Sequence, residues 1–263
     1  MNWKQTLFWS FSAAAIFYYF LLFGVFVFVG QEEMQLFIPE WWYIREFLFQ
    51  PGGFCAVAGQ WIIQYYRQPM SAVVFHTVLL VGCGFMVYRI LRCFSDKTYL
   101  LFLSLLPVLY LVKMSIHGEY LVDGTVGVVL MLLALSVSLK VRRAGSIAGY
   151  GIASTLFLCG LTGLLSVCYA FLYTLLALLR YKTSRQRLAA SACLIPALFI
   201  YLFSGWLGIP VPLSDGWMPE AYLEIQRLPH YYMYRVWTFF TLSIVGVALF
   251  ARFVPVSYTH LRA

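Results

Sequence analysis

Charged residues in this sequence are confined to the gaps between long apolar segments, and the sign of the charge alternates from one gap to the next. The positive-inside rule assigns the basic gaps of a membrane protein to the cytoplasm. Only 11% of the residues are charged and 62% are hydrophobic, whereas about a quarter of a soluble domain is charged. The sequence therefore predicts an all-α, polytopic membrane helix bundle that contacts the lipid bilayer, with its N-terminus in the cytoplasm.

Apolar segments of suitable length mark the predicted membrane spans. These spans are 7–29, 71–91, 99–114, 124–139, 188–209 and 237–254. The stretch 146–179 is shorter than the roughly 40 residues that two full crossings need. A break at 160–163 would make it a hairpin of two short helices, whereas a single crossing would separate the basic segments 140–143 and 180–187. The positive-inside rule favours the hairpin and a total of eight membrane-inserted helices.

This topology leaves the external face as the place for polar chemistry. Twelve Lys and Arg residues fall in the cytoplasmic gaps and five in the external ones, while Asp96 is the one cytoplasmic residue of ten acidic residues. The net charge of +8 is spread over short clusters beside apolar segments, so nucleic acid is not an expected partner. No charged residue lies near the middle of a predicted span, which disfavours proton- or ion-coupled transport.

The first external loop, 30–70, is long for a connection within a helix bundle, and long loops are often functional. We expect two helices in it, at 41–49 and 54–66, separated by Pro-Gly-Gly at 51–53. Both are too short and too polar to cross the membrane. They are therefore predicted to lie in the membrane interface with their aromatic residues in the lipid.

The C-terminal segment 256–263 (VSYTHLRA) departs from the apolar pattern. It resembles a translated sequencing adapter, and an ordinary polar tail is the alternative. We expect residues 256–263 to be non-native and residues 1–255 to be the integral membrane domain, the N-terminal part of a longer protein.

The adjacent carboxylates Glu32 and Glu33 follow the first span directly. At the membrane surface they could act as a general base or hold a divalent cation, because hard cations prefer oxygen ligands. The alternative is a solvated flank at the external end of a helix. The identity of any cofactor is open.

A second polar group lies between the third and fourth spans and contains His117, Glu119 and Asp123. These side chains could supply acid, base or metal-ligand chemistry, although they match no established metal spacing. The alternative is a turn that is polar because water reaches it. His76, inside the second span, is a further candidate, with a neutral, hydrogen-bonded histidine as its alternative.

Segments 33–37 (Glu-Met-Gln-Leu-Phe), 51–53 and 64–66 (Gln-Tyr-Tyr) are similar to those of an uncharacterised family of bacterial multi-spanning membrane proteins. That resemblance implies a helical fold in the bacterial inner membrane and a longer chain with a further domain. It implies no activity.

The order of first span, acidic pair and long external loop resembles the GT-C glycosyltransferases. This resemblance implies transfer of sugar from a polyprenyl-phosphate donor at the external face, with Glu32 or Glu33 in the position of the family's functional acidic residue. GT-C enzymes often have Asp-Glu where this chain has Glu-Glu. The alternatives are a non-catalytic membrane scaffold or envelope-assembly protein and, third, a lipid or solute transporter.

Overall fold

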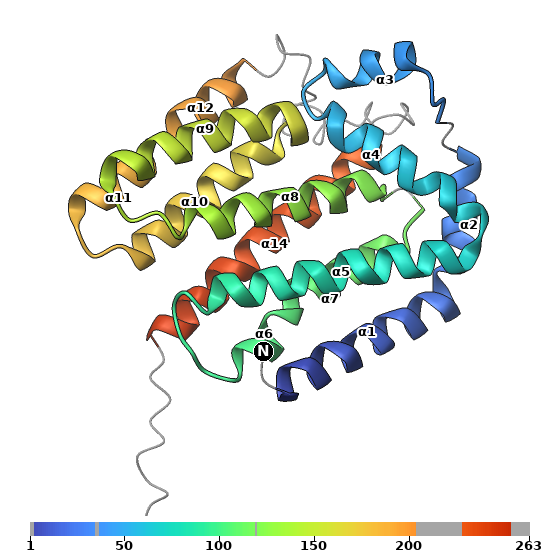
Figure 1. Cartoon of the computed structure of the whole chain (residues 1–263), viewed down its shortest axis with the longest axis horizontal. Helices are drawn as coiled ribbons and strands as arrows, with labels where there is room; N and C mark the ends of the chain where they lie inside the picture. The colour runs from blue at the N-terminus through green and yellow to red at the C-terminus, as the bar shows by residue number, and fades with distance from the viewer. Residues whose placement is uncertain (1–2, 35–36, 119, 204–227, 254–263) are drawn as a thin grey trace, which may run out of the picture.

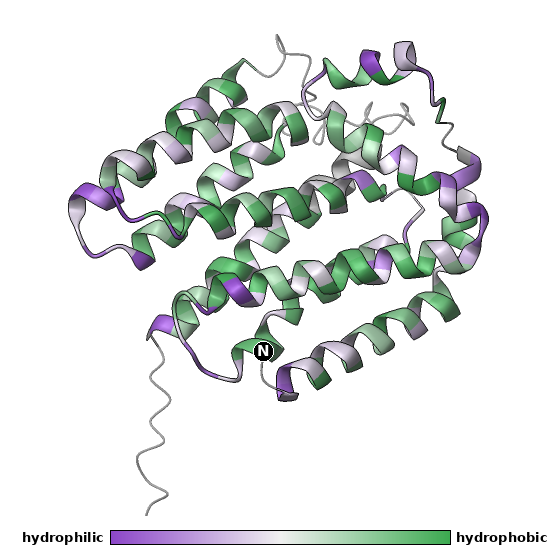
Figure 2. Cartoon of the chain, in the orientation of Figure 1, coloured by the Kyte–Doolittle hydropathy of each residue, from purple (hydrophilic) through white to green (hydrophobic). Residues whose placement is uncertain are grey.

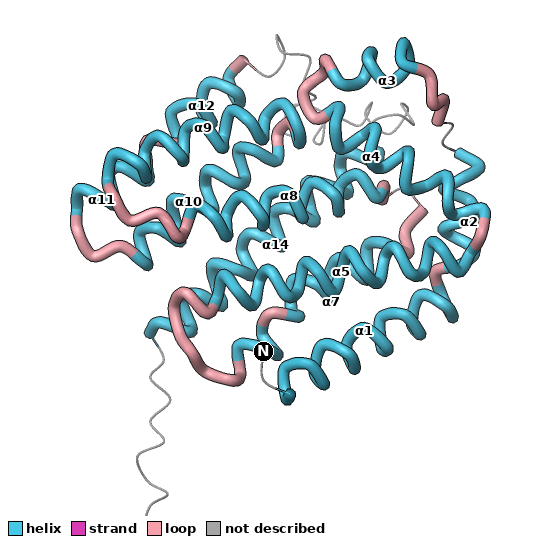
Figure 3. The backbone as a smooth tube through the Cα atoms, in the orientation of Figure 1, coloured by secondary structure: helices cyan, strands magenta, loops and turns pink. Residues whose placement is uncertain are grey.

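The computed structural model describes residues 3–34, 37–118, 120–203 and 228–253, and every regular element in these ranges is a helix (Figures 1 and 3). The predicted all-α class is therefore confirmed. The predicted tail, 256–263, lies outside the described residues. Among the described residues, most buried hydrophobic side chains form one large core between the helices, and Leu164 and Ile200 form a small second cluster.

Three of the described helices are long and apolar enough to cross a membrane: α1 (Trp3–Phe23), α5 (Pro69–Leu91) and α9 (Ala144–Thr162). Shorter apolar helical segments accompany them: Leu100–Ser115, which includes α7 (Leu105–Ser115), then α8 (Val122–Ser138), α10 (Leu165–Arg180), and Val236–Arg252 within α14 (Leu228–Phe253). A helix of 17 residues is about 26 Å long, close to the thickness of the hydrocarbon layer. These helices indicate a membrane protein, while the number of crossings, eight, stays a prediction.

The outer surface of the helices is apolar. Phe11, Phe26 and Ile195 are 77%, 89% and 71% exposed. Hydrophobic positions cover most of the helix lengths, and hydrophilic ones gather at helix ends and connections (Figure 2). Because soluble monomers seldom expose large contiguous apolar patches, this exterior is suited to lipid contact.

The first predicted span, 7–29, is divided into two helices, α1 and α2 (Val25–Met34), at Gly24. A Cβ atom at Gly24 would lie 2.8 Å from Cε2 of Phe28, so the missing side chain makes room for this buried ring. The helical hydrogen bonds nearly continue across the break, since Gly24 donates to the carbonyl of Phe20 at 2.8 Å.

Two further predicted spans are also interrupted. Segment 99–114 forms α6 (Leu100–Leu103) and α7, with Pro107 just after the break. Segment 188–209 forms parts of α11 (Ser184–Ser191) and α12 (Leu194–Leu202), with Pro196 after the break, and its end lies outside the described residues. Proline has no N–H to donate to the carbonyl four residues earlier, so each break has a physical cause.

The stretch 146–179 is a hairpin, as predicted, although α9, with 19 residues, is not a short helix. Helix α9 ends at Thr162 and α10 begins at Leu165, and the two helices pack against each other. Gly163 makes the turn with a φ of +61°, a value that a residue with a side chain adopts only with strain. The hairpin brings the basic segments 140–143 and 180–187 to one end of the bundle.

Hydrogen bonds hold these two basic segments together. The hydroxyl of Tyr181 donates to the carbonyl of Val141 at 2.7 Å, and the amide of Gln186 donates to the carbonyl of Arg142 at 2.7 Å. Both basic segments therefore lie on the same side of any membrane that the bundle occupies. Which side this is remains a prediction.

The long loop 30–70 contains α3 (Trp41–Leu48), α4 (Gly53–Ile63) and the short 3-10 helix η1 (Gln64–Arg67). Its turn at Pro51-Gly-Gly docks onto the turn of the α9–α10 hairpin. The N–H of Gly52 donates to the carbonyl of Gly160 at 3.1 Å, and a Cβ atom on Gly52, whose φ is +84°, would lie 3.3 Å from the nitrogen of Gly163. Glycine in both turns lets the two backbones approach closely.

The two helices predicted in this loop are present, and their interfacial location stays a prediction. Helix α3 has no buried residue. Helix α4 packs against α8 and α9 and buries Cys55, Gly59 and Ile62. The physical reason is its small residues. Gly59 lies directly over the backbone of Asp123, where a Cβ atom would come within 3.0 Å of both its nitrogen and its Cα.

Candidate functional site

The end of α2 is tied to the connection between α7 and α8. Gln31 is completely buried, and its side-chain amide donates to the carbonyl oxygen of Tyr120 at 2.9 Å. The carbonyls of His117 and Gly118 lie 3.5 Å from the same nitrogen. The two polar groups that the sequence singles out thus belong to neighbouring segments at one end of the bundle.

Glu32 and Glu33 occupy the last turn of α2, where Glu32 is half-buried and Glu33 is exposed. The C-terminal end of a helix carries partial negative charge, so a carboxylate there is disfavoured by roughly 0.3–1 kcal/mol. No basic residue lies in that turn to offset it. Residues that oppose local preferences often occur at functional sites, and the functional role of this pair stays a prediction.

The second polar group of the sequence analysis contains His117, Glu119 and Asp123, and only part of it is described near the end of α2. His117 lies exposed in the α7–α8 connection, and Glu119 lies outside the described residues. Asp123 is half-buried in the first turn of α8, and its Oδ1 accepts a hydrogen bond from the N–H of Gly124 at 2.7 Å. A carboxylate is stabilised at a helix N-terminus, so the position of Asp123 has a structural explanation.

The Cys55 thiol of α4 lies near Asp123 and is buried. Burial raises the pKa of the Cys55 thiol to about 12, and the negative charge of Asp123 acts in the same direction. The thiolate is the reactive form of cysteine, so Cys55 stays protonated and packs as an apolar side chain. Within the described part of the chain, no three His, Cys, Asp or Glu residues gather as a metal site, and the divalent cation stays an untested expectation.

The side chain of Tyr120 attaches the α7–α8 connection to α8. Its hydroxyl lies 3.1 Å from Oγ1 of Thr125, and both side chains are buried. Burial raises the pKa of the Tyr120 phenol, so it remains neutral and able to donate a hydrogen bond. The carbonyl of Tyr120, which accepts the hydrogen bond from the Gln31 amide, therefore belongs to a turn that is held in place.

The surroundings of His76 are those of a neutral, hydrogen-bonded histidine, which is the alternative to a functional role. It is 1% exposed, and its Nε2 lies 2.7 Å from the hydroxyl of Tyr66 in η1. The ring of Phe28 stacks on the imidazole with centroids 4.3 Å apart, and Phe20 lies 5.4 Å away. These apolar neighbours disfavour a charged imidazole, so His76 is a packing residue that links α5 to η1.

The sequence interpretation missed Gln31 and Tyr66. Gln31 continues the buried side of the first two helices, on which Phe20, Gly24 and Phe28 follow one another at spacings of four residues. That helical period was visible in the sequence and could have identified Gln31 as a buried polar residue. Tyr66 has no such signal, because its partner His76 is identified only by the fold.

The apolar exterior and the long apolar helices define the chain as a helical membrane protein. Its family follows from comparison with known proteins. A family model described as "Family of unknown function (DUF6057)" matches residues 1–262, and the chain belongs to this family. No curated protein and no solved structure matches the chain.

Proposed function

We propose that this protein is a GT-C-like glycosyltransferase of the bacterial inner membrane, which transfers sugar from a polyprenyl-phosphate donor at the external face. The proposed reaction site lies where the end of α2 meets the α7–α8 connection. In the proposed orientation the basic segments 140–143 and 180–187 face the cytoplasm, and this end of the bundle faces outward.

The hydrogen bond from Gln31 to the carbonyl of Tyr120 is the observation that carries the proposal. It ties the helix turn with Glu32 and Glu33 to the segment that contains His117. Acidic and basic groups from two parts of the chain thus share one end of the bundle, which is what general acid–base catalysis on a bound substrate requires.

Glu32 is the proposed general base. It is half-buried beside Gln31, whereas Glu33 is exposed, so the Glu32 carboxylate lies nearer to the interior of the bundle. In the proposed step the Glu32 carboxylate takes the proton of an acceptor hydroxyl while the hydroxyl oxygen attacks the anomeric carbon. The bond from that carbon to the phosphate oxygen breaks, and polyprenyl phosphate leaves.

The remaining predicted residues have supporting roles in the proposal. His117 is exposed on the same connection and would contact the leaving phosphate, together with Glu119 if a cation bridges them. Asp123 holds the start of α8 through Gly124 and positions the connection. The Glu32 carboxylate would supply the base, and the His117 imidazole would compensate the negative charge of the phosphate.

Complementation of a deletion strain tests the proposal. Surface glycans of the strain are measured by mass spectrometry with the wild-type chain, with Glu32→Gln, and with Glu46→Gln as the control. Glu46 is an exposed carboxylate of α3 in the same external loop. General-base catalysis contributes about 10²–10⁴-fold, so Glu32→Gln should lose the transferred sugar at equal protein level, while Glu46→Gln keeps it.

The alternative function makes a different prediction in the same experiment. A scaffold or envelope-assembly protein acts through its fold and surface, so Glu32→Gln combined with Glu33→Gln would restore the strain as well as wild type. Unchanged surface glycans in the double variant would reject the transferase. A lipid or solute transporter would leave glycan composition intact even in the deletion strain.

A further inference from the structure

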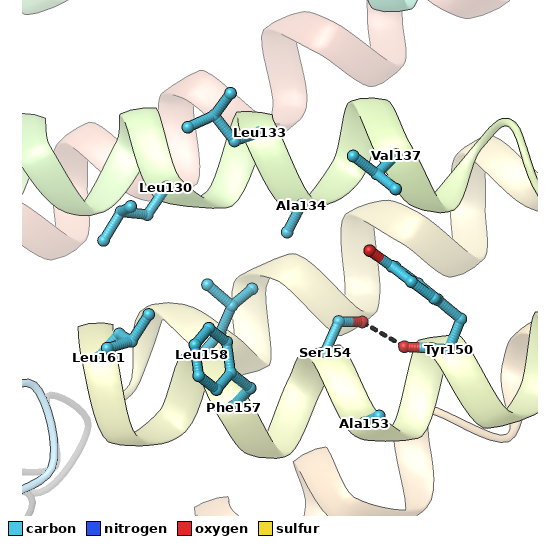
Figure 4. A pocket seen from close by; sticks show the side chains of 10 residues that line it. All are labelled: Leu130, Leu133, Ala134, Val137, Tyr150, Ala153, Ser154, Phe157, Leu158 and Leu161. Atoms are coloured by element: carbon cyan, nitrogen blue, oxygen red, sulfur yellow. Dashed lines mark hydrogen bonds between the residues drawn. The ribbon is translucent and has the colours of Figure 1, made fainter.

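An open groove of about 620 Å³ runs between α8 and α9. Leu130 and Leu161 line one end, and Val137 and Tyr150 line the other (Figure 4). Ala134 of α8 and Ala153 of α9 lie between these ends, where their small side chains leave space. The volume falls in the range of small-molecule sites, roughly 300–1,000 Å³.

Apolar side chains line most of the groove, and its polar side chains are those of Ser154 and Tyr150. Ser154 donates to the carbonyl of Tyr150 at 2.6 Å, as Figure 4 shows. The hydroxyl of Tyr169 in α10 lies 2.6 Å from Oγ of Ser154 and 2.6 Å from Oγ of Ser138. The Ser154 hydroxyl is therefore already hydrogen-bonded within the protein. A ligand in the groove contacts mainly apolar side chains.

Three cations lie just beyond the Val137 end of the groove. Lys140, Arg142 and Arg143 are exposed in the connection between α8 and α9, and none of them forms an ion pair within the part of the chain that the structure describes. Lys140 follows Val137 by three residues, less than one helical turn of about 5 Å. The bonds from Tyr181 and Gln186 to this connection keep its backbone in place.

We propose that the groove and these cations form a binding site for one anionic phospholipid. An acyl chain lies along the groove between α8 and α9, and the phosphate headgroup contacts Lys140, Arg142 and Arg143. This site goes beyond the proposed transferase and does not depend on it. The charge argues for a lipid as the occupant, because an apolar helix of a second copy would fill the groove and leave the three cations without a counter-charge.

Native mass spectrometry of the purified chain tests the site. The protein is exchanged into micelles with equal amounts of phosphatidylglycerol and phosphatidylcholine that have identical acyl chains. We expect one retained phospholipid with about a tenfold preference for phosphatidylglycerol, since each basic residue near an anionic headgroup contributes on the order of a tenfold factor or less. Equal retention of both lipids, or no retained lipid, would reject the proposal.

A charge variant isolates the headgroup contacts. Replacing Lys140, Arg142 and Arg143 with Gln should abolish the preference while a lipid is still retained. The matched control replaces Arg89, Arg92 and Lys97 with Gln, which removes the same charge at the α5–α6 connection. If the control loses the preference to the same extent, net charge and not this site selects the lipid, and the proposal fails.

A groove variant isolates the acyl-chain contacts. Ala134→Phe should lower retention of both lipids about tenfold, and Ala153→Phe, at an exposed position that does not disturb the core, should do the same. Ala14→Phe on the exposed face of α1 is the control and should retain lipid as wild type does. If the groove variants lose a dimer but still retain lipid, the occupant is a second copy of the chain. That result would overturn the assignment of the groove to a phospholipid.

Discussion

The side-chain amide of Gln31 and the carbonyl of Tyr120 are joined by a 2.9 Å hydrogen bond, and both residues are buried. They are 89 positions apart in the chain, so this bond connects the first pair of helices to the turn between α7 and α8. This contact and the packing of α2 against α5 and η1 hold the acidic end of α2 beside that turn.

Replacing Gln31 should destabilise the fold. Gln31→Leu leaves the buried carbonyl of Tyr120 without its donor, and an unsatisfied buried group costs about 1–3 kcal/mol. The free energy of unfolding, measured by denaturant titration in mixed micelles, should fall by that amount. Gln50→Leu, at an exposed position after α3, should change it by less than about 0.5 kcal/mol. Equal effects of both variants would contradict the role assigned to Gln31.

The pair of Tyr66 and His76 should show strong coupling. Tyr66→Phe removes the hydroxyl that lies 2.7 Å from Nε2 of His76 and should cost about 1–3 kcal/mol, because a buried ring nitrogen loses its partner. Combining it with His76→Phe removes both polar groups and should recover part of that stability. A double-mutant cycle in micelles measures the coupling, and additive single effects would show that the two residues do not interact.

Alanine at two glycines should act in opposite directions. A Cβ atom at Gly59 would lie 2.8 Å from Cβ of Asp123 and 3.0 Å from its main-chain atoms, so Gly59→Ala should separate α4 from α8 and cost about 1–3 kcal/mol. At Gly149 in α9 nothing lies within 4 Å. Gly149→Ala should therefore stabilise the helix by up to about 1 kcal/mol. Thermal unfolding of both variants checks this, and equal shifts would refute the close packing at Gly59.

Thiol labelling should determine the orientation. Cys93 is exposed at the end of α5, and an impermeant maleimide should label it only after the cells are permeabilised. In a Cys93→Ser background, Arg142→Cys and Lys182→Cys should behave in the same way, whereas Glu46→Cys should be labelled in intact cells. Opposite labelling of Arg142→Cys and Lys182→Cys would disprove the hairpin of α9 and α10.

Much of the fold could be predicted because it depends on local sequence. Apolar segments predict helices, and the charge pattern around 146–179 predicts the hairpin, which α9 and α10 form. The breaks between Leu103 and Leu105 and between Ser191 and Leu194 were also readable, since Pro107 and Pro196 are tolerated in the first turn of a helix but not in its interior. Of the candidate site, the sequence predicts which residues are polar, but it does not predict that Gln31 bonds to Tyr120.

Hydropathy and charge act on each segment separately, so the helical class, the lipid-facing character and the hairpin can be predicted from the sequence. Which segments meet is a property of the tertiary structure. It buries α4 against α8 through Gly59, docks Gly52 onto the hairpin turn at Gly163, and pairs Gln31 with the carbonyl of Tyr120. These contacts depend on the close approach of distant backbones, and a hydropathy pattern contains no information about such distances.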